Sequence, residues 1–433
     1  MMTATMSNET VTLEALPRIV QAGRETTVTL RPRDPQARLP AAAWRVAVVP
    51  LGGLDRQTRH PEATACDARL TAEGLTVSLV FPSEQEYALL VERVTDGTPA
   101  AVADVRVYAV AADLFARRPF KGDFHIHSNR SDGREPPAHV AGACRRIGMD
   151  FMALTDHRQY APSLEAIAAF ANTGTDLRIF PGEEVHSPDT SVHIVSFGGR
   201  WSVNDLFATD RYRQEVAARA AAIAGLPGGT DPLPYVACEW CFDEIRRAGG
   251  LGMFCHPYWV CRSRLDVPAA LTDLLFERQP FDALEVIGGY YVHESESNHL
   301  QVTRYYTELA QGRRIPIVGA SDAHGCERPE LFGWYYSIVF AASPDLQDVI
   351  GAVRDFNAVA VDAMNGQPAR AVGPFRLVRY AQFLLREVLP RHDALCVEEG
   401  RLMVAHAAGD TAAAEQLRAL GGQVARLYAT LWG

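Results

Sequence analysis

The chain has 433 residues and a formal net charge of −10, because 42 lysines and arginines face 52 aspartates and glutamates. Hydrophobic residues make up 48% of the sequence and charged residues 22%, which is typical of folded proteins and excludes global disorder. The acidic balance argues against a scaffold that binds nucleic acid, although it leaves room for a locally positive pocket. At about 150 residues per domain, the length allows two or three domains.

Targeting signals are not visible in the sequence. No run of about 18 apolar residues occurs, so we expect no transmembrane helix and no membrane partner. Residues 1–11 are polar and lack the apolar core of a secretory signal. Eight cysteines in a chain of this length do not form a disulfide framework. We therefore expect a cytoplasmic protein.

Residues 1–115 are predicted to form a β-rich domain. Short segments rich in valine, leucine and threonine are separated by polar stretches that carry proline or glycine. These segments are residues 25–30, 44–49, 75–81 and 104–110. Short strands at this spacing favour a small β-sandwich. The domain holds no dense cluster of ligand-type residues, so we expect a lid, a brace or an oligomerisation surface.

From Lys121 onward, short apolar runs alternate with helical patterns. The predicted strands are residues 123–127, 151–155, 177–180, 192–197, 251–255, 283–287 and 315–319. The predicted helices are residues 137–147, 163–171, 215–224, 241–248, 269–276 and 297–311. This alternation predicts βαβ units around a parallel sheet, and seven units fit a closed barrel related to the (β/α)₈ design. We assign residues 116–341 to the barrel and residues 342–433 to a mostly helical C-terminal extension.

Metal-binding residue types gather at the C-terminal ends of the predicted strands, where such a barrel carries its active site. His125 and His127 lie two residues apart on the first strand, so both side chains face the same side. The other candidates are Asp132, His157, one of Glu183 and Glu184, His193, His256, Asp322 and His324. Only the sixth strand, residues 283–287, ends without an obvious ligand. If these residues were distributed at random along the chain, so many of them would not fall at the C-terminal ends of the predicted strands.

This set of residues predicts a centre with two or three divalent ions. Imidazole and carboxylate together suit Zn²⁺, Mn²⁺ or Fe²⁺. Nine ligands exceed the four that one tetrahedral zinc needs, so at least one carboxylate would bridge two ions. Neighbouring divalent ions lower the pKa of a shared water and stabilise developing oxyanion charge, so a Ser-His or Cys-His nucleophile pair is not required.

The motifs, in this order, resemble those of the PHP (polymerase and histidinol phosphatase) family of metallohydrolases. They are His125-Ile-His127, Asp132-Gly133, Thr155-Asp156-His157, Gly182-Glu183-Glu184, His193, His256-Pro257 and Ser321-Asp322-Ala323-His324. The resemblance covers residues 121–325 and implies a distorted (β/α)₇ barrel. The Gly-X-Glu pattern of the family selects Glu184. A basic lead-in within residues 117–133 and the β-rich N-terminal part look like the CehA/McbA branch, which includes carbaryl-type carbamate hydrolases.

The resemblance also implies a ligand assignment. A first ion would be held by His125, His127, Glu184 and Asp322, a second by Glu184, His193 and His256, and a third by Asp132, His157 and His324. Glu184 would bridge the first two ions, and occupancy of the third site varies within the family. Asp322, His324 and Glu184 are the predicted catalytic residues. Asp322 or His324 could relay a proton to the leaving group, a role that sequence does not separate from ligation.

Four residues near the predicted rim are candidate substrate contacts: Arg158, Tyr258, His186 and His293. Arg158 could hold a phosphate or a carboxylate, or it could be an ordinary surface arginine. Tyr258, with Trp259, could wall an aromatic pocket or pack in the core. His186 and His293 are additional ionisable groups in the loops after the third and sixth strands.

Three functions remain open from the sequence. A cluster of divalent ions suits a phosphate ester, which we favour slightly. A carbamate, ester or amide hydrolase is the alternative, supported by the CehA/McbA-like features and the aromatic residues. A non-catalytic metal-binding module is the third. The expected partner is a small-molecule substrate, and the N-terminal domain or the C-terminal helices could each form a homo-oligomer.

Overall fold

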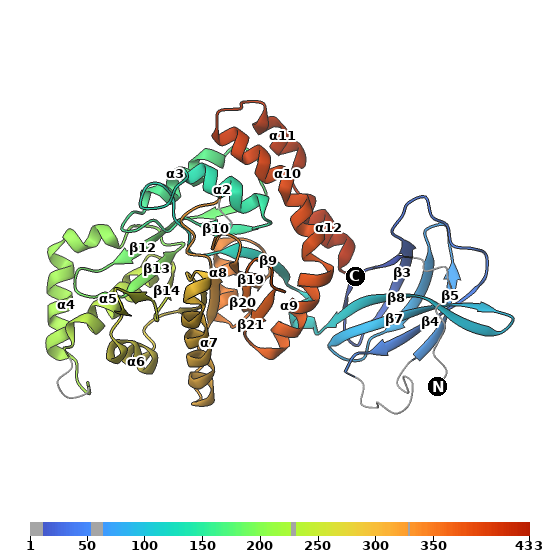
Figure 1. The fold of residues 1–433 in the computed structure, drawn as a ribbon, viewed down its shortest axis with the longest axis horizontal. Coiled ribbons are helices and arrows are strands. Elements are labelled where there is room, and N and C mark those ends of the chain that lie inside the picture. Colours follow the sequence, from blue (N-terminus) through green and yellow to red (C-terminus); the bar gives the residue numbers. More distant parts are fainter. Residues whose placement is uncertain (1–11, 53–63, 227–230, 328–329) are drawn as a thin grey trace. The chain divides into compact units, whose positions relative to one another are not determined.

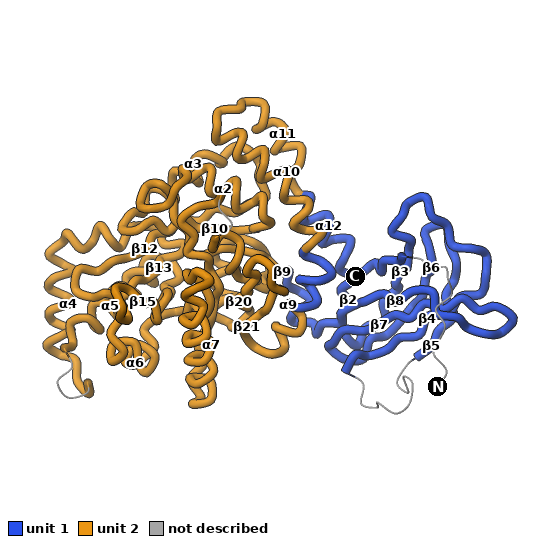
Figure 2. The backbone as a smooth tube through the Cα atoms, in the orientation of Figure 1, with its two compact units in different colours: residues 1–118, 382–389, 423–433 blue, residues 119–381, 390–422 orange. Residues whose placement is uncertain are grey.

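The computed structural model describes residues 12–52, 64–226, 231–327 and 330–433. The N-terminal residues 1–11, considered above for a secretory signal, lie outside the described residues. The chain divides into two compact units (Figure 2). Unit 1 comprises residues 1–118, 382–389 and 423–433, and unit 2 comprises residues 119–381 and 390–422. The stretch 342–433, predicted as a C-terminal extension, therefore contributes to both units.

Unit 1 is a curled, mainly antiparallel sheet with the strand order β1-β3-β6-β5-β4-β7-β8-β2. The strands are β1 (Leu13–Leu16), β2 (Ile19–Gln21), β3 (Glu25–Pro32), β4 (Ala43–Pro50), β5 (Thr64–Leu70), β6 (Leu75–Val80), β7 (Gln85–Thr95) and β8 (Thr98–Val110), and helix α1 (Ala112–Phe115) follows. Only β2 pairs in parallel, with β8. All four strands predicted in this region are confirmed, as parts of β3, β4, β6 and β8.

The core of unit 1 follows the period of two that strands impose. In β3 the buried residues are Val28 and Leu30, and in β6 they are Leu75, Val77 and Leu79. These side chains form one cluster with the inward residues of β4, β7 and β8. The buried and exposed residues of these strands therefore alternate, with one face of the sheet turned to the core.

Unit 2 contains two sheets surrounded by helices (Figure 1). One sheet has the order β11-β10-β9-β19-β20-β21, and the other has the order β12-β13-β14-β17-β18. The strands are β9 (Arg118–Asp123), β10 (Phe151–Ala153), β11 (Arg178–Phe180), β12 (Gly182–His186), β13 (His193–Phe197), β14 (Leu251–Phe254), β17 (Ala283–Gly288), β18 (Ile317–Ala320), β19 (Tyr335–Ala341), β20 (Ala358–Asp362) and β21 (Arg370–Val372). A small hairpin, β15 (Val260–Cys261) and β16 (Arg264–Leu265), follows β14.

The helices of unit 2 lie where helices were predicted, but those predicted at 215–224 and 241–248 begin earlier, at Asp210 and Leu233. They are α2 (Pro137–Arg146), α3 (Ala161–Phe170), α4 (Asp210–Ala222), α5 (Leu233–Arg247), α6 (Ala269–Arg278), α7 (Ser295–Ala310) and α8 (Leu346–Arg354), with short 3₁₀ turns at Asn204–Ala208 and Val292–Glu294. The C-terminal helices are α9 (Phe375–Glu387), α10 (Leu389–Ala407), α11 (Ala413–Leu420) and α12 (Gln423–Leu431). None of the helices in the described residues combines the length and the apolar character that a membrane span requires.

The predicted all-parallel sheet is wrong in part. β9, β10 and β11 pair in parallel, as do β14, β17 and β18. However, β13 runs antiparallel to both β12 and β14. The loop at residues 187–192 explains the first reversal, because it is too short for the crossover that a parallel connection needs. Strands β20 and β21 were not predicted, since they lie in a stretch expected to be helical, and they extend the first sheet in antiparallel pairing.

Two isolated bridges connect the sheets at the ends of their strands. Ile126 pairs with Ala323 and His157 pairs with Glu184, each in parallel orientation. The first bridge sets the motif at 125–127 beside the motif at 322–324, with hydrogen bonds from the Asp322 amide to the His125 carbonyl (2.8 Å) and from the His127 amide to the Ala323 carbonyl (3.0 Å). The bridges thus bring the ligand-type residues of distant segments together.

Candidate metal centre

The centre of the candidate site is the carboxylate of Glu184, on β12. Its side chain is fully buried, and ring nitrogens of six histidines lie within 4 Å of its oxygens. These are His125 (3.7 Å), His127 (3.6 Å), His186 (3.5 Å), His193 (2.8 Å), His256 (3.4 Å) and His157, which is in close contact. Gly182 permits this arrangement, because a Cβ there would lie 2.7 Å from the Leu154 carbonyl oxygen. β12 can therefore approach the end of β10, which places Glu184 beside His157.

Glu183 faces away from this cluster, as the alternation along a strand requires. Its carboxylate accepts hydrogen bonds from the Ser202 hydroxyl and the Asn204 side-chain amide, both at 2.8 Å. These neutral donors satisfy a buried carboxylate without a cation. The two adjacent glutamates therefore occupy different environments, and only Glu184 faces the histidines.

Asp322 lies between the first two histidines. Its Oδ1 atom is 3.1 Å from His125 Nε2 and 2.9 Å from His127 Nε2. Asp322 has a φ of +49°, and His256 has a φ of +28°. Residues other than glycine rarely adopt this left-handed region, and such strain concentrates at functional sites.

Asp132 forms the outer part of the cluster with two further histidines. Its Oδ2 lies 3.3 Å from His157 Nε2, and its Oδ1 lies 3.3 Å from His324 Nε2. Gly133 allows the loop to fold back here, since a Cβ at this position would lie 2.7 Å from the His127 carbonyl oxygen. The Asp-Gly pair therefore has a direct steric role in placing the Asp132 carboxylate.

Several overlapping groups could hold a metal ion, because their ligand atoms all lie within 4.8 Å of one another. The groups are His127-Asp132-His157-His324, His125-His127-Glu184, Glu184-His193-His256, His157-Glu184-His186 and His125-Cys255-His256. The nine metal ligands predicted from the sequence thus lie close together. Asp322 belongs to none of these groups, but it contacts His125 and His127. Glu184 belongs to three of the groups, as a bridging ligand would.

Two polar atoms in the cluster fit a role as ligands of a cation. Glu184 Oε2 and His193 Nδ1 are buried and have no hydrogen-bond partner. His193 Nδ1 is only 2.8 Å from Glu184 Oε1, so this close contact lacks hydrogen-bond geometry. Buried polar groups are nearly always satisfied. Ligand atoms that converge in this way are what a divalent cation requires.

Hydrogen bonds outside the cluster orient two of the rings. The Nδ1 atom of His125 lies 2.9 Å from Glu285 Oε2, and the Nδ1 atom of His324 lies 2.8 Å from the Asp322 carbonyl oxygen. If Nδ1 donates in both cases, each ring directs the lone pair of Nε2 into the cluster. Metal-binding histidines are commonly held in this way.

The electrostatics of the cluster keep its carboxylates ionised. Burial alone would raise the pKa of Glu184, but the surrounding histidines hold it well below its usual range. Burial lowers the pKa of His157, yet Asp132 and Glu184 together raise it to about 10. Burial lowers the pKa of His186 to about 4, so this ring is neutral at physiological pH and its nitrogen can act as a ligand.

The sequence did not predict Glu285, on β17, as part of the site. Its side chain is buried, and its two oxygens face His125 Nδ1 (2.9 Å) and the His256 backbone amide (3.3 Å). It lies inside the strand, whereas the candidate ligands predicted from the sequence lie at or near strand ends. A glutamate within the apolar run 283–287 is the signal that could have revealed it.

An open cavity of about 680 Å³ adjoins the cluster. Its lining residues are Arg130, Ser131, Asp132, His157, Arg158, Gln159, His186, His193, Trp259, Cys261, Arg262, Arg264 and Asp266. Of the predicted substrate contacts, Arg158 and His186 line it, and His186 also touches Glu184. Tyr258 and His293 do not: Tyr258 lies near Arg304, and His293 stacks on the Tyr291 ring.

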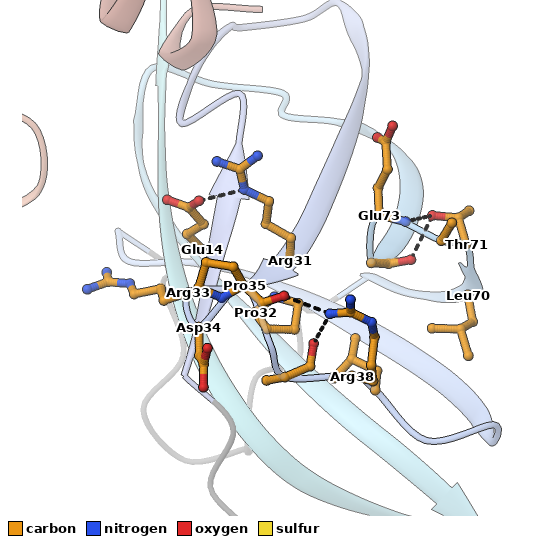
Figure 3. A pocket seen from close by; sticks show the side chains of 14 residues that line it. Glu14, Arg31, Pro32, Arg33, Asp34, Pro35, Arg38, Leu70, Thr71 and Glu73 are labelled. Carbon is orange, nitrogen blue, oxygen red and sulfur yellow. Dashed lines mark hydrogen bonds and ion pairs between the residues drawn. The ribbon is translucent and has the colours of Figure 1, made fainter.

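Unit 1 has a cavity of its own, of about 620 Å³, which also contains arginines (Figure 3). There, Arg31 Nε donates to Glu14 Oε1 at 2.6 Å, and Arg38 donates to the carbonyl oxygens of Pro35 and Ala37. The guanidinium groups of Arg31 and Arg38 are therefore occupied by the protein itself. The third arginine of this cavity, Arg33, forms neither a side-chain hydrogen bond nor an ion pair with the described residues. Among the described residues, the groups that could hold a metal ion all lie in unit 2, and none lies in this cavity.

Comparison with known proteins gives partial likenesses. No family model matches the chain. A segment of 96 residues is 32% identical to DNA polymerase/3'-5' exonuclease PolX of Bacillus subtilis, and the match covers 21% of this chain and 16% of that protein. The chain thus matches about one sixth of the length of this relative.

Three solved structures resemble parts of the chain. One is a two-domain protein from Bacteroides vulgatus that contains a predicted PHP-like metal-dependent phosphoesterase, with 18% identity over 61% of this chain and 69% of that chain and a TM-score of 0.41. A metal-dependent phosphoesterase from Bifidobacterium adolescentis has 22% identity over 49% and 90% of the two chains and a TM-score of 0.34. An amidohydrolase from Chromobacterium violaceum with bound sulfate has 22% identity over 47% and 87% and a TM-score of 0.30.

Proposed function

We propose that the protein is a metal-dependent phosphoesterase of the PHP family, built on the distorted (β/α)₇ barrel of that family. The observation that carries the proposal is the buried Glu184 carboxylate, surrounded by six histidines and adjoining an arginine-lined cavity. The segment similar to PolX supports the family. The β-rich unit that precedes the first motif supports the narrower CehA/McbA-like branch.

Two or three divalent ions are proposed as cofactors, with the ligand sets that the family resemblance implies. The mixture of imidazole and carboxylate donors fits Zn²⁺, Mn²⁺ or Fe²⁺. Bound ions of this kind activate a water molecule near neutral pH and offset the charge that develops on the substrate. Glu184 is proposed as the bridging ligand, and Cys255 is an additional candidate because its Sγ lies 4.0 Å from Glu184 Oε1.

The chain's own residues would bind and orient the substrate. Arg158 lines the cavity next to His157, and its guanidinium can hold two phosphoryl oxygens at once. Its φ of +58° is a strained conformation for an arginine. When no ion is bound by Asp132, His157 and His324, His324 and Asp322 are proposed to move a proton to the leaving group. With a third ion, His324 would act as a ligand instead.

The composition of the cavity favours a phosphate ester over a carbamate. Its lining contains four arginines, whereas Trp259 is its only aromatic ring other than histidine. The carbamate alternative depends on an aromatic pocket, and Tyr258 does not contribute to this one. Guanidinium groups match the geometry and the charge of phosphate, but a neutral N-methylcarbamate would gain little from them.

The test is hydrolysis of three substrates with one leaving group: 4-nitrophenyl phosphate, bis(4-nitrophenyl) phosphate and 4-nitrophenyl N-methylcarbamate. We expect protein loaded with Mn²⁺ or Zn²⁺ to prefer a phosphate ester. Glu184→Gln should reduce kcat by more than ~10²-fold, a loss of the size seen when one group that stabilises transition-state charge is removed.

Glu183→Gln is the matched control, because it makes the same chemical change one residue away in a carboxylate that faces neutral donors. It should retain metal content and most of the activity. Preference for the carbamate would support the alternative hydrolase. Absence of turnover in metal-replete, folded protein, together with stable binding to a specific partner, would support a non-catalytic module.

A further inference from the structure

The cavity beside the metal centre is positive on a chain that is acidic overall. Four arginines line it, against two aspartates, Asp132 and Asp266. Asp132 is one of the candidate ligands, so a bound cation would neutralise it. By contrast, the whole chain has a net charge of −10. A positive cavity of this kind concentrates anionic ligands next to the site.

Three of these arginines have no partner among the residues that the structure describes. Arg130 forms a bidentate ion pair with Glu165, in which Nε donates to Oε2 at 2.9 Å and Nη2 donates to Oε1 at 2.8 Å. Among the described residues, the guanidinium groups of Arg158, Arg262 and Arg264 form neither a hydrogen bond nor an ion pair. In the cavity of unit 1, by contrast, Arg31 and Arg38 are occupied, and only Arg33 of its three arginines lacks such a partner among the described residues. Three guanidinium groups in one cavity therefore remain available for a ligand.

Two of the three are carried by the hairpin β15–β16. Val260 pairs with Leu265 and Cys261 pairs with Arg264, which leaves a two-residue turn. Both turn residues have positive φ, +50° for Arg262 and +66° for Ser263. Such turns strongly favour asparagine or glycine, because other side chains are strained there. An arginine at this position therefore costs conformational energy that its interactions within the protein do not offset.

The hairpin is anchored to the metal centre. The Trp259 amide donates to the His256 carbonyl oxygen (3.1 Å), and the Asp266 amide donates to the Trp259 carbonyl oxygen (3.0 Å). The Trp259 ring lies 6.1 Å from the ring centroids of both His193 and His256. The Ser191 hydroxyl holds the Asp266 carbonyl oxygen at 2.9 Å. The hairpin therefore follows the candidate ligand His256 closely in the chain, and Trp259, which precedes it, lies near both His193 and His256.

We infer that Arg262 and Arg264 form a second anion-binding subsite, so that the substrate is a phosphoester with a further anionic group. This inference rests on the proposed function. Arg158 follows the ligand His157 and holds the phosphoryl group that reacts. The hairpin arginines bind a carboxylate or a second phosphate elsewhere on the same molecule. Binding energy at this second group then selects the substrate.

The test uses phosphonates, which are not hydrolysed, in pairs of equal length. Phosphonoacetate, 3-phosphonopropionate and 4-phosphonobutyrate carry a terminal carboxylate, and ethyl-, propyl- and butylphosphonate do not. Binding to the metal-loaded protein is measured by calorimetry at physiological ionic strength. For at least one length, the carboxylate should strengthen binding ~10-fold or more, which is typical of hydrogen bonds between charged groups.

Variants assign this preference to the hairpin. Arg262→Ala and Arg264→Ala should each reduce the affinity ratio within the pair, and the double variant should reduce it to about 1. Arg213→Ala is the matched control, since it removes the same charge from exposed α4, where Arg213 contacts only Asp210. The control should keep the wild-type ratio. An equal loss in the control would mean a general charge effect and would overturn the subsite.

The possible failures are distinguishable. If 4-nitrophenyl phosphate is hydrolysed but no pair shows a preference for the carboxylate, the subsite is wrong and the phosphoesterase stands. If nothing is hydrolysed but the preference is present and requires the hairpin, the anion site stands and the proposed reaction is wrong. If phosphonates do not bind and no phosphate ester is hydrolysed, both are wrong.

Discussion

Unit 2 buries charged side chains in two regions, and their partners differ. The first region lies where β10 and β11 begin, and we call it the salt-bridge network. It comprises Lys121, Arg145, Asp150, Asp176, His392, Asp393 and Glu399. The second region is the metal centre, where the same strands end. In the network, Arg145 Nε lies 2.7 Å from Glu399 Oε2, and Lys121 Nζ lies 3.0 Å from Asp393 Oδ2.

The two regions differ in how their buried polar atoms are satisfied. Among the described residues, no side-chain atom of the network is buried without a hydrogen-bond partner. In the metal centre, two buried atoms have none, and the Nε2 atoms of His125 and His127 face each other at 3.2 Å. Burial of charge therefore does not by itself indicate function. Acceptors that converge on one another, with too few donors, indicate a cation site.

The largest effect is expected from breaking the network at Arg145. Arg145→Met leaves Glu399 buried without its cation and removes one of the two cationic partners of Asp150, the other being His392. This should reduce the free energy of unfolding of unit 2 by about 3–5 kcal/mol. Urea denaturation followed by intrinsic fluorescence measures the loss, and metal content is determined on the folded protein. Arg145→Lys should recover part of the stability. A folded Arg145→Met protein that loses its metal would show that the two regions are coupled.

A smaller effect is expected at Glu285, which orients a ligand from outside the cluster. Glu285→Gln should weaken metal binding ~10–100-fold, the range found when partners of metal-binding histidines are removed. Unlike a change in the salt-bridge network, Glu285→Gln should cost the metal-free protein little stability relative to metal-free wild type. Glu277→Gln, on the exposed face of α6, is the control for the same change of charge. Unchanged metal affinity in Glu285→Gln would show that the hydrogen bond to His125 is unimportant for binding.

The smallest effect concerns the pH dependence of the network. Burial lowers the pKa of His392, but Asp150 and Asp393 together raise it well above its usual value. A raised pKa in the folded state means that His392 stabilises the fold fully below about pH 6.5, its unfolded value, and that this stabilisation disappears as the pH rises through the folded pKa.

The matched variant is His392→Gln, which keeps a polar side chain without the charge. It should be less stable than wild type by about 1 kcal/mol at pH 6, and the difference should shrink as the pH increases. Thermal unfolding across this pH range measures both proteins. A difference that grows with pH would contradict the protonated state of His392.

Much of the site could be predicted from sequence, because its residues follow local rules. His125 and His127 share a face since they are two residues apart on an extended segment. Their meeting with Asp322 and His324, nearly 200 positions away, follows from the common end of parallel strands. Glu184 was separated from Glu183 only by the family pattern, and the structure gives the physical reason: the two carboxylates face opposite sides of β12.

Other features depend on tertiary contacts that no local pattern encodes. Glu285 reads as one polar residue in a buried strand, and its role appears only when His125 is placed beside it. The antiparallel course of β13 follows from the short loop after β12, and β12 was not predicted as a separate strand. The pairing of β20 with β19 was also not predicted. Likewise, the hairpin that carries Arg262 and Arg264 is too short to produce a periodic signal.

The most direct test of the central claim is to titrate Mn²⁺ into chelator-treated protein and to measure stoichiometry by calorimetry. Wild type should bind at least two ions per chain. Glu184→Gln, with a circular dichroism spectrum like that of wild type, should bind at least one ion fewer or bind ~10-fold more weakly. Glu183→Gln should bind as wild type does. Identical binding by wild type and Glu184→Gln, or no binding by wild type, would contradict a cation centre around Glu184.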